Sequence, residues 1–387
     1  MKDGKQLSFL NRVWHLILAF ILAFGTFANI QTATAQPGVI QGARGVIDAV
    51  RPQNVAKGLS SLGERGIPER EAYSAPPRGD LNSIYPVGVQ DISWPSREGV
   101  TVSALVFYPE TRPVAGSKFS AVIFSHGLGS SAENFSYLGR SWAGRGIVSI
   151  FLRHPESDES IWRGKIRAMG ELKDAYSKYW TGSDRVRALR AGIDYLYEHH
   201  NDPGPLGSYV DLNRIGVAGN DLGALAALLL AGQIPLDGAR TYKDPRVSGV
   251  LALSPPVFCE PERGPIVYEN ISAPTMIVTG TEDNGIVGTT KAHERRIPYD
   301  SIRGVDKYLV VLQGADHRVY GGRRMGAKHA SDQPFQQTIR QETSDFWSAY
   351  LQTEPSILRQ LCAQGKTVPF SNARVEWLLG GSRLAAF

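Results

Sequence analysis

The amino-acid sequence predicts a mostly parallel, doubly wound α/β sheet with helices on both faces. Short apolar runs alternate along the chain with longer segments of helical periodicity, which is the order expected of strands joined by crossover helices. Several runs are apolar throughout, as strands buried on both faces are. Residues able to carry chemistry follow three of the runs, at the strand ends where doubly wound sheets place their sites.

The predicted elements begin with a β-hairpin. Residues 88–94 and 99–109 alternate apolar and polar side chains around Pro95-Ser96-Arg97-Glu98. Buried strands are then predicted at residues 119–124, 147–152, 215–218, 247–253, 274–279 and 307–312, the last being the final strand. Helices are predicted at residues 130–145, 185–199, 224–231 and 335–351, with Ser183-Asp184 capping the second and the fourth closing the sheet.

The first 35 residues have the composition of a secretory signal peptide. Two lysines and an arginine precede an apolar run over residues 13–27, and Ala33-Thr34-Ala35 offers a cleavage site. The run is shorter than the ~20 apolar residues that span a bilayer, which favours cleavage over an uncleaved membrane anchor. We therefore expect a secreted or periplasmic protein with no integral membrane span after cleavage.

Residues 36–85 are rich in glycine, proline, serine and charge, which predicts a partly disordered N-terminal arm. The net charge of the 387-residue chain is +5 without a basic block, so composition gives no support for nucleic-acid binding. The two cysteines, Cys259 and Cys362, form either one disulfide or two free thiols. The oligomeric state is not predicted.

The segment of residues 214–232 (RIGVAGNDLGALAALLLAG) organises the rest of the chain. A short β-branched strand leads into the turn Gly219-Asn220-Asp221-Leu222-Gly223, and a helix of small residues follows. This is the layout of a nucleophile elbow, G-x-Nu-x-G, whose glycines let strand and helix cross closely around a strained central residue. Such elbows normally carry serine at the centre, where this chain has Asp221.

Three further motifs follow other predicted strands: Ser125-His126-Gly127-Leu128-Gly129, Gly280-Thr281-Glu282-Asp283 and Gly314-Ala315-Asp316-His317. Elbow, acid and histidine occur in that chain order. In this ordered set the chain resembles the dienelactone-hydrolase and platelet-activating-factor-acetylhydrolase branch of the α/β-hydrolase superfamily. The resemblance implies an α/β-hydrolase domain over residues 86–387. It also implies a substrate that is a lipid or small acyl ester, hydrolysed without a cofactor.

The resemblance implies a role for each motif. His317 would be the general base, and Asp283 would fix its tautomer, with the neighbouring Glu282 as the second candidate for the acid. The backbone N–H groups of Leu128 and Leu222 would form an oxyanion hole.

Each of these residues also has a structural interpretation. Asp283 could cap a turn, and a lone histidine after a strand is more often a surface or capping residue than a catalyst. His126 is expected to be structural, because the family uses the backbone that follows it. The spacing of histidine, cysteine and acidic residues indicates no metal site.

Asp221 departs from the family's serine and changes the chemistry that we expect. A carboxylate is already ionised at neutral pH, but its attack on an ester carbonyl gives an anhydride that returns to ester. Carboxylates instead attack saturated carbon, as in the α/β-hydrolases of alkyl halides and epoxides. The usual halide-binding donors are missing, since Leu222 and Leu128 stand in their places. No long cap is evident, although residues 153–182 could pass over the active-site face and contain Tyr176 and Tyr179.

Three hypotheses about function stay open. The chain is an exported ester hydrolase with altered chemistry, an inactive hydrolase-fold protein that binds a ligand or partner, or an Asp-nucleophile hydrolase of alkyl halides or epoxides. The resemblance favours the first of these.

Overall fold

A computed structural model describes residues 85–321, 332–352, 367–368 and 373–378 of the chain. The predicted signal peptide, the N-terminal arm apart from Tyr85, and Cys362 with its possible disulfide lie outside the described residues. Within the described ranges, no helix has the length and apolar character that a membrane span requires.

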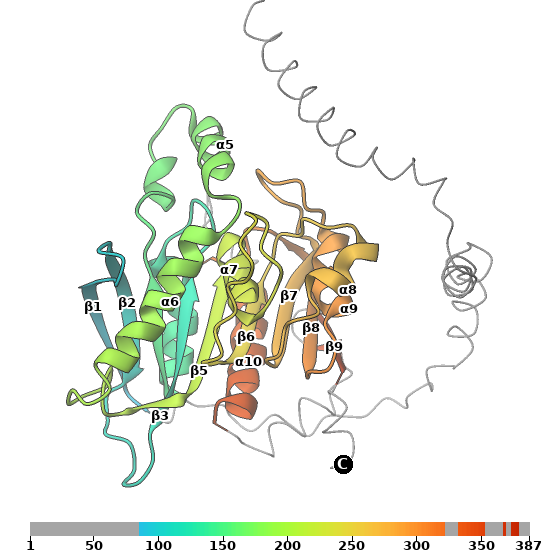
Figure 1. Ribbon diagram of the computed structural model, residues 1–387. Coiled ribbons are helices and arrows are strands. Elements are labelled where there is room, and N and C mark those ends of the chain that lie inside the picture. Colours follow the sequence, from blue (N-terminus) through green and yellow to red (C-terminus); the bar gives the residue numbers. More distant parts are fainter. Residues whose placement is uncertain (1–84, 322–331, 353–366, 369–372, 379–387) are drawn as a thin grey trace, which may run out of the picture. The chain divides into compact units, whose positions relative to one another are not determined.

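One ten-stranded sheet forms the centre of the fold, in the order β1-β2-β4-β3-β5-β6-β7-β8-β10-β9 (Figure 1). The six central strands, from β4 to β8 in this order, pair in parallel, and the strands at both edges pair antiparallel. The predicted α/β fold with a mostly parallel sheet is therefore confirmed. The strands are β1 (Val87–Pro95), β2 (Thr101–Pro109), β3 (Phe119–Ser125), β4 (Ile147–Leu152), β5 (Val210–Asn220), β6 (Val247–Leu253), β7 (Thr275–Glu282), β8 (Lys307–Asp316), β9 (Thr367–Val368) and β10 (Ala373–Leu378).

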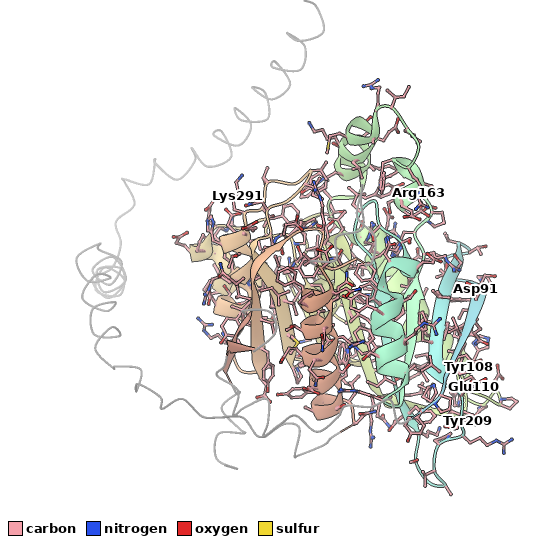
Figure 2. The ribbon with its side chains drawn as sticks, turned by 180° about the vertical axis from the view of Figure 1, so that it is seen from behind. Asp91, Tyr108, Glu110, Arg163, Tyr209 and Lys291 are labelled. Carbon is pink, nitrogen blue, oxygen red and sulfur yellow. The ribbon has the colours of Figure 1, made fainter. Side chains whose placement is uncertain are left out.

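Helices cover both faces of the sheet. The helices α6 (Ser183–Glu198) and α7 (Leu222–Ala231) pack into one apolar core. The helices α4 (Ser136–Ala143) and α10 (Gln333–Tyr350) pack into the other. Figure 1 shows α6 and α7 in front of the sheet, and Figure 2 shows the opposite face with α10 in front.

Alternate residues of the strands enter the two cores because successive side chains of a strand point to opposite faces. In β3, for example, Ile123 faces α6 and α7, whereas Phe124 faces α4 and α10. The other helices in the part of the chain that the structure describes are α5 (Ala168–Tyr179), α8 (Gly264–Val267), α9 (Ile297–Ser301) and four short 3₁₀ helices at Ala132–Phe135, Glu159–Ile161, Pro261–Arg263 and Ala292–Arg296.

The predicted hairpin is confirmed as the antiparallel pair β1 and β2, and the predicted bounds of β4 and β6 agree with the structure. The helix predicted over residues 130–145 was wrong as one element, because a 3₁₀ turn, Ala132–Phe135, precedes α4. The predicted cap of α6 was also wrong. The helix begins at Ser183, and Gly182 precedes it in the left-handed conformation with no side-chain cap.

The prediction that β8 is the final strand was wrong. The structure adds β10 beside β8 and β9 beside β10, both antiparallel. Pairing with β10 covers the outer edge of β8, whose backbone N–H and C=O groups would otherwise lie unpaired.

Candidate active site

The turn of the elbow contains fewer residues than the five, Gly219 to Gly223, that the sequence predicted. The strand β5 begins at Val210 and continues through Asn220, and α7 begins at Leu222, so Asp221 alone makes the turn. Its backbone angles, φ 50° and ψ −120°, lie outside the regions that side-chain-bearing residues favour, at a cost of about 1–3 kcal/mol. The neighbouring strand helps to hold this conformation, because the Asp221 amide donates to the Leu253 carbonyl at 3.0 Å.

Three glycines allow the segments around Asp221 to approach one another. A Cβ atom on Gly219 would overlap the backbone of Gly223, and one on Gly223 would overlap the Ser125 carbonyl. A Cβ on Gly127 would lie 2.9 Å from the Asp221 Cβ. The close crossing of β5 and α7, and the approach of the loop after β3, both therefore depend on residues without side chains.

The structure brings His317 and Asp283 into direct contact. His317 follows β8 and Asp283 follows β7, which is the adjacent strand. The His317 Nδ1 atom lies 2.8 Å from Asp283 Oδ1. Glu282, the second candidate for the acid, is exposed, whereas Asp283 is fully buried. Asp283 is therefore the carboxylate placed to orient the imidazole.

Asp283 is surrounded by hydrogen-bond donors. Ser254 Oγ donates to Oδ1 at 2.8 Å, and Tyr320 OH donates to Oδ2 at 2.9 Å. The Arg295 guanidinium lies 3.1 Å from Oδ1. Burial would raise the pKa of Asp283, but the hydrogen bond with His317 and the Arg295 charge outweigh it and lower the pKa to about 2. Asp283 is therefore a stable anion at neutral pH.

Sequence reasoning assigned a role to none of these three partners, Tyr320 included. Ser254 follows β6 directly, and this place at a strand end was the signal that the sequence offered for it. Its φ of 52° is positive, which is unusual for a residue with a side chain. Arg295 lies on a 3₁₀ helix and is only 1% exposed. Nothing in the sequence marks it as a buried cation, because its acceptors are the carboxylate and carbonyl of Asp283 and the carbonyls of Ser254 and Pro255.

The two oxygens of the Asp221 carboxylate face different groups. Oδ2 accepts a hydrogen bond from the Leu128 amide at 3.3 Å, and Leu128 supplies one of the two predicted oxyanion-hole amides. The other predicted amide is that of Leu222, the first residue of α7, and the first amides of a helix have no intrahelical partner. Oδ1 lies 4.0 Å from His317 Nε2, which is too far for a hydrogen bond.

A cavity of about 180 Å³ opens onto Asp221 and His317. Its far wall comes from residues 153–182, which lie beyond the carboxyl ends of the strands and include α5 (Figure 1). This segment contributes the apolar side chains of Trp162, Met169 and Leu172, together with Arg163, which Figure 2 labels. The loop after β7 adds Ile286 and Val287.

One phenol faces the carboxylate across this cavity. Tyr176 of α5 lines the cavity, whereas Tyr179 is buried in the core that contains α6 and α7. Burial, and then the charge of Asp221, raise the pKa of Tyr176. The phenol is therefore protonated at neutral pH and can donate a hydrogen bond to a ligand beside Asp221.

His126, which was expected to be structural, is buried and its Nδ1 lies 2.8 Å from the Gly127 carbonyl. Among the residues that the structure describes, no three histidine, cysteine, aspartate or glutamate side chains are grouped as a metal site. Compared with known proteins, the sequence matches no family model and no curated protein.

Proposed function

We propose that the chain is an exported hydrolase with the α/β-hydrolase fold, in which the Asp221 carboxylate attacks a saturated carbon of the substrate. One observation carries this proposal: Leu128 holds Oδ2 of Asp221, while Oδ1 faces the cavity and lies 4.0 Å from His317. Because Oδ1 makes no hydrogen bond to His317, its lone pairs are available to attack the substrate. A carboxylate is also a nucleophile without a base to deprotonate it.

The first step forms a covalent ester. Oδ1 of Asp221 bonds to the saturated carbon while the bond from that carbon to its leaving atom breaks. If the leaving atom is an epoxide oxygen, Tyr176 donates its phenolic proton to the alkoxide that forms. The Asp221 carboxylate thereby becomes an alkyl ester, and its carbonyl oxygen lies at the Leu128 amide.

The second step returns the enzyme to its starting state. His317 Nε2 takes a proton from water, and the hydroxide attacks the carbonyl carbon of the Asp221 ester. The Leu128 and Leu222 amides stabilise the tetrahedral oxyanion, and Asp283 stabilises the imidazolium. The bond from the carbonyl carbon to the alkyl oxygen then breaks, and the alcohol leaves with a proton from His317. Asp221 is left as a carboxylic acid, and its proton returns to the Tyr176 phenolate where an epoxide was opened, or to solvent otherwise, so that the Asp221 carboxylate is regenerated.

Among substrates of this type, the cavity favours a small apolar epoxide. Tyr176 supplies an O–H donor suited to an oxygen leaving group. A halide would need N–H donors instead, and the indole N–H of Trp162, which lines the cavity, already donates to the Gly129 carbonyl at 2.6 Å. The apolar side chains of Trp162, Met169 and Leu172 favour an apolar substituent on the epoxide, although Glu159, Arg163 and Arg318 also line the cavity.

Carboxylic-ester hydrolysis, which the resemblance implies, is the second candidate. The His317–Asp283 pair favours it, because the same pair would activate water for direct attack on an ester carbonyl. The Asp221 carboxylate disfavours it, since Oδ2 occupies the amide that the ester oxygen would need.

The decisive experiment traps the intermediate. His317→Gln removes the base of the second step only, so the variant should accumulate an adduct of one substrate mass when it is mixed with a small apolar epoxide, read by intact-protein mass spectrometry. Peptide mapping should locate the adduct on Asp221. The matched control, Glu282→Gln, alters an exposed carboxylate beside the site and should turn over without an adduct.

Isotope labelling separates the remaining hypotheses. In a single turnover of the wild type in heavy-oxygen water, the label should enter the Asp221 carboxylate. Ester turnover without label in Asp221 would support the second candidate instead. If the wild type hydrolyses neither epoxides nor p-nitrophenyl esters while Asp221→Ser gains esterase activity, the chain is a binding protein.

A further inference from the structure

We propose that Arg185 is a positioning residue, which fixes the Leu128 amide against Asp221 and supplies positive charge behind the oxyanion hole. Arg185 lies in the first turn of α6 and is 1% exposed. Its Nε donates to the His126 carbonyl at 3.1 Å, and its Nη2 donates to Ser157 Oγ at 2.9 Å. Arg185 therefore ties the loop after β3 to residues 153–182.

These two contacts bracket Leu128. The His126 carbonyl lies just before the Gly127-Leu128 pair in the chain. Ser157 holds the other side, because its carbonyl accepts from the Gly129 amide at 2.8 Å. The backbone on each side of Leu128 is thus anchored, directly or through Ser157, to one buried guanidinium. A small rotation of this loop would move the Leu128 amide away from Asp221.

The charge of Arg185 has no ion-pair partner among the described residues. The adjacent acid, Asp184, pairs with Arg187 instead. Burial lowers the pKa of Arg185 to about 10, and the Asp221 charge opposes that shift, so the guanidinium is charged at neutral pH. A buried cation without a counter-ion is costly, and Asp221 is the foremost anion that offsets the cost.

Two neighbours of Arg185 stay neutral. Burial, and then the charge of Arg185, lower the pKa of His126 to about 4, and the same two causes hold the pKa of His154 well below its usual range. Arg185 is therefore the single cation of this buried cluster at neutral pH. Its field favours negative charge at the Leu128 amide, first on the Asp221 carboxylate and then on the tetrahedral oxyanion.

The catalytic meaning of this placement rests on the proposed function, but its geometry can be tested without a substrate. Amide hydrogen exchange of the full mature chain, read at Leu128 and Gly129, should be roughly 10-fold faster in Arg185→Gln than in the wild type. The matched control, Arg187→Gln, changes an exposed arginine of the same helix and should leave both amides unchanged.

A second variant covers the case in which Arg185→Gln does not fold. Ser157→Ala removes only the Nη2 acceptor and keeps the carbonyl that binds Gly129, so it should fold and show a smaller rise in exchange at the same amides. Unchanged exchange at Leu128 in every variant that folds, with the melting temperature also unchanged, overturns the proposal whether or not the protein turns over a substrate.

Single-turnover kinetics then test the charge. Hydrolysis of the covalent intermediate should slow by about 10²-fold in Arg185→Gln, as when an oxyanion donor is lost, while KM changes little. Arg185→Lys keeps the charge and should recover most of the rate. Equal rates in Arg185→Gln and the wild type overturn the proposal, whereas an absence of turnover in every protein, with exchange altered as expected, overturns only the proposed function.

Discussion

Asp283 and Asp221 lie on opposite sides of the His317 ring, one near each nitrogen, and their surroundings differ sharply. Asp283 is fully buried, lies 2.8 Å from His317 and accepts hydrogen bonds from Ser254, Thr279 and Tyr320. Asp221 has a side chain that is 16% exposed, with one amide donor at 3.3 Å and a strained backbone. A carboxylate whose oxygens are fully used can orient the imidazole, whereas one with a free oxygen can react.

Arg295 and Arg185, the two arginines that are buried among the described residues, differ in the same way. Arg295 contacts the Asp283 carboxylate directly, at 3.1 Å. Arg185 contacts no carboxylate within ion-pair distance among the described residues, and it acts on Asp221 through the loop that carries Leu128. One acid is thus neutralised in place, while the other keeps its charge available at the cavity.

Exchanging the carboxylate at the reactive position should have the largest effect. Asp221→Asn keeps the size of the side chain but removes the anionic nucleophile, so kcat should fall on the order of 10⁴-fold or more, as it does when other nucleophiles are removed. Epoxide turnover measured with purified, active-site-titrated protein checks this. Retention of more than a tenth of the wild-type rate would show that Asp221 is not the nucleophile.

Removing the orienting carboxylate should instead damage the fold. Asp283→Ala leaves the Arg295 cation buried without its counter-ion, and it leaves the Tyr320 hydroxyl without its acceptor. We expect a loss of about 3–5 kcal/mol in the free energy of unfolding. Urea denaturation followed by circular dichroism measures it, with Asp221→Asn as the matched control, which should lose less because Asp221 makes no direct ion pair with a buried arginine. Equal losses at the two positions would contradict the contrast between them.

Protonation of Asp283 in acid should lower the free energy of unfolding. The folded-state pKa is about 2, below its ordinary value of 3.8, so the unfolded chain binds the proton more readily. The stabilisation is complete above about pH 4 and is lost as the pH falls through 2. It amounts to about 2.5 kcal/mol, from roughly 1.4 kcal/mol per pKa unit. Urea midpoints measured between pH 5 and pH 2 should fall more steeply in the wild type than in Asp283→Asn.

The smallest effect should be the stability gained when the strain of the Asp221 turn is relieved. Glycine adopts positive φ without steric cost, so Asp221→Gly should relieve the strain of the turn and be about 1 kcal/mol more stable than Asp221→Ala, while both variants lack turnover. Thermal unfolding of Asp221→Gly and Asp221→Ala makes the comparison, because alanine keeps the Cβ and the strain. A glycine variant no more stable than the alanine variant would show that the turn is not strained.

Sequence reasoning reached the position of the site through chain order and strand ends. Asp221, Asp283 and His317 each follow an apolar run, and parallel strands bring their carboxyl ends to one edge. It did not reach Arg185 and Arg295, because the burial of a charged side chain depends on acceptors from distant segments. For Arg185 these are the His126 carbonyl and Ser157, 59 and 28 residues away.

The errors in the fold prediction also arise where the structure depends on contacts that the local sequence does not reveal. The strand β10 pairs with β8, which lies far before it in the sequence, and a six-residue segment carries too little periodicity to reveal such a partner. At the start of α6, Ser183 and Asp184 have the residue types of a cap, but both lie inside the helix, because the left-handed turn at Gly182 takes the position before it. In both places a tertiary or backbone effect outweighed the local pattern.

Ser157 belongs to the segment of residues 153–182, which supplies one wall of the cavity, and it also supports the loop that carries Leu128. Its carbonyl holds the Gly129 amide, its hydroxyl holds Arg185, and Trp162 of the same segment holds the Gly129 carbonyl. A movement of this wall that admitted a larger molecule would therefore also loosen the oxyanion-hole backbone. Under the proposed mechanism, a molecule too large for the cavity could therefore enter only by displacing the Leu128 amide from the position in which it stabilises the oxyanion. Such a molecule would bind without being hydrolysed.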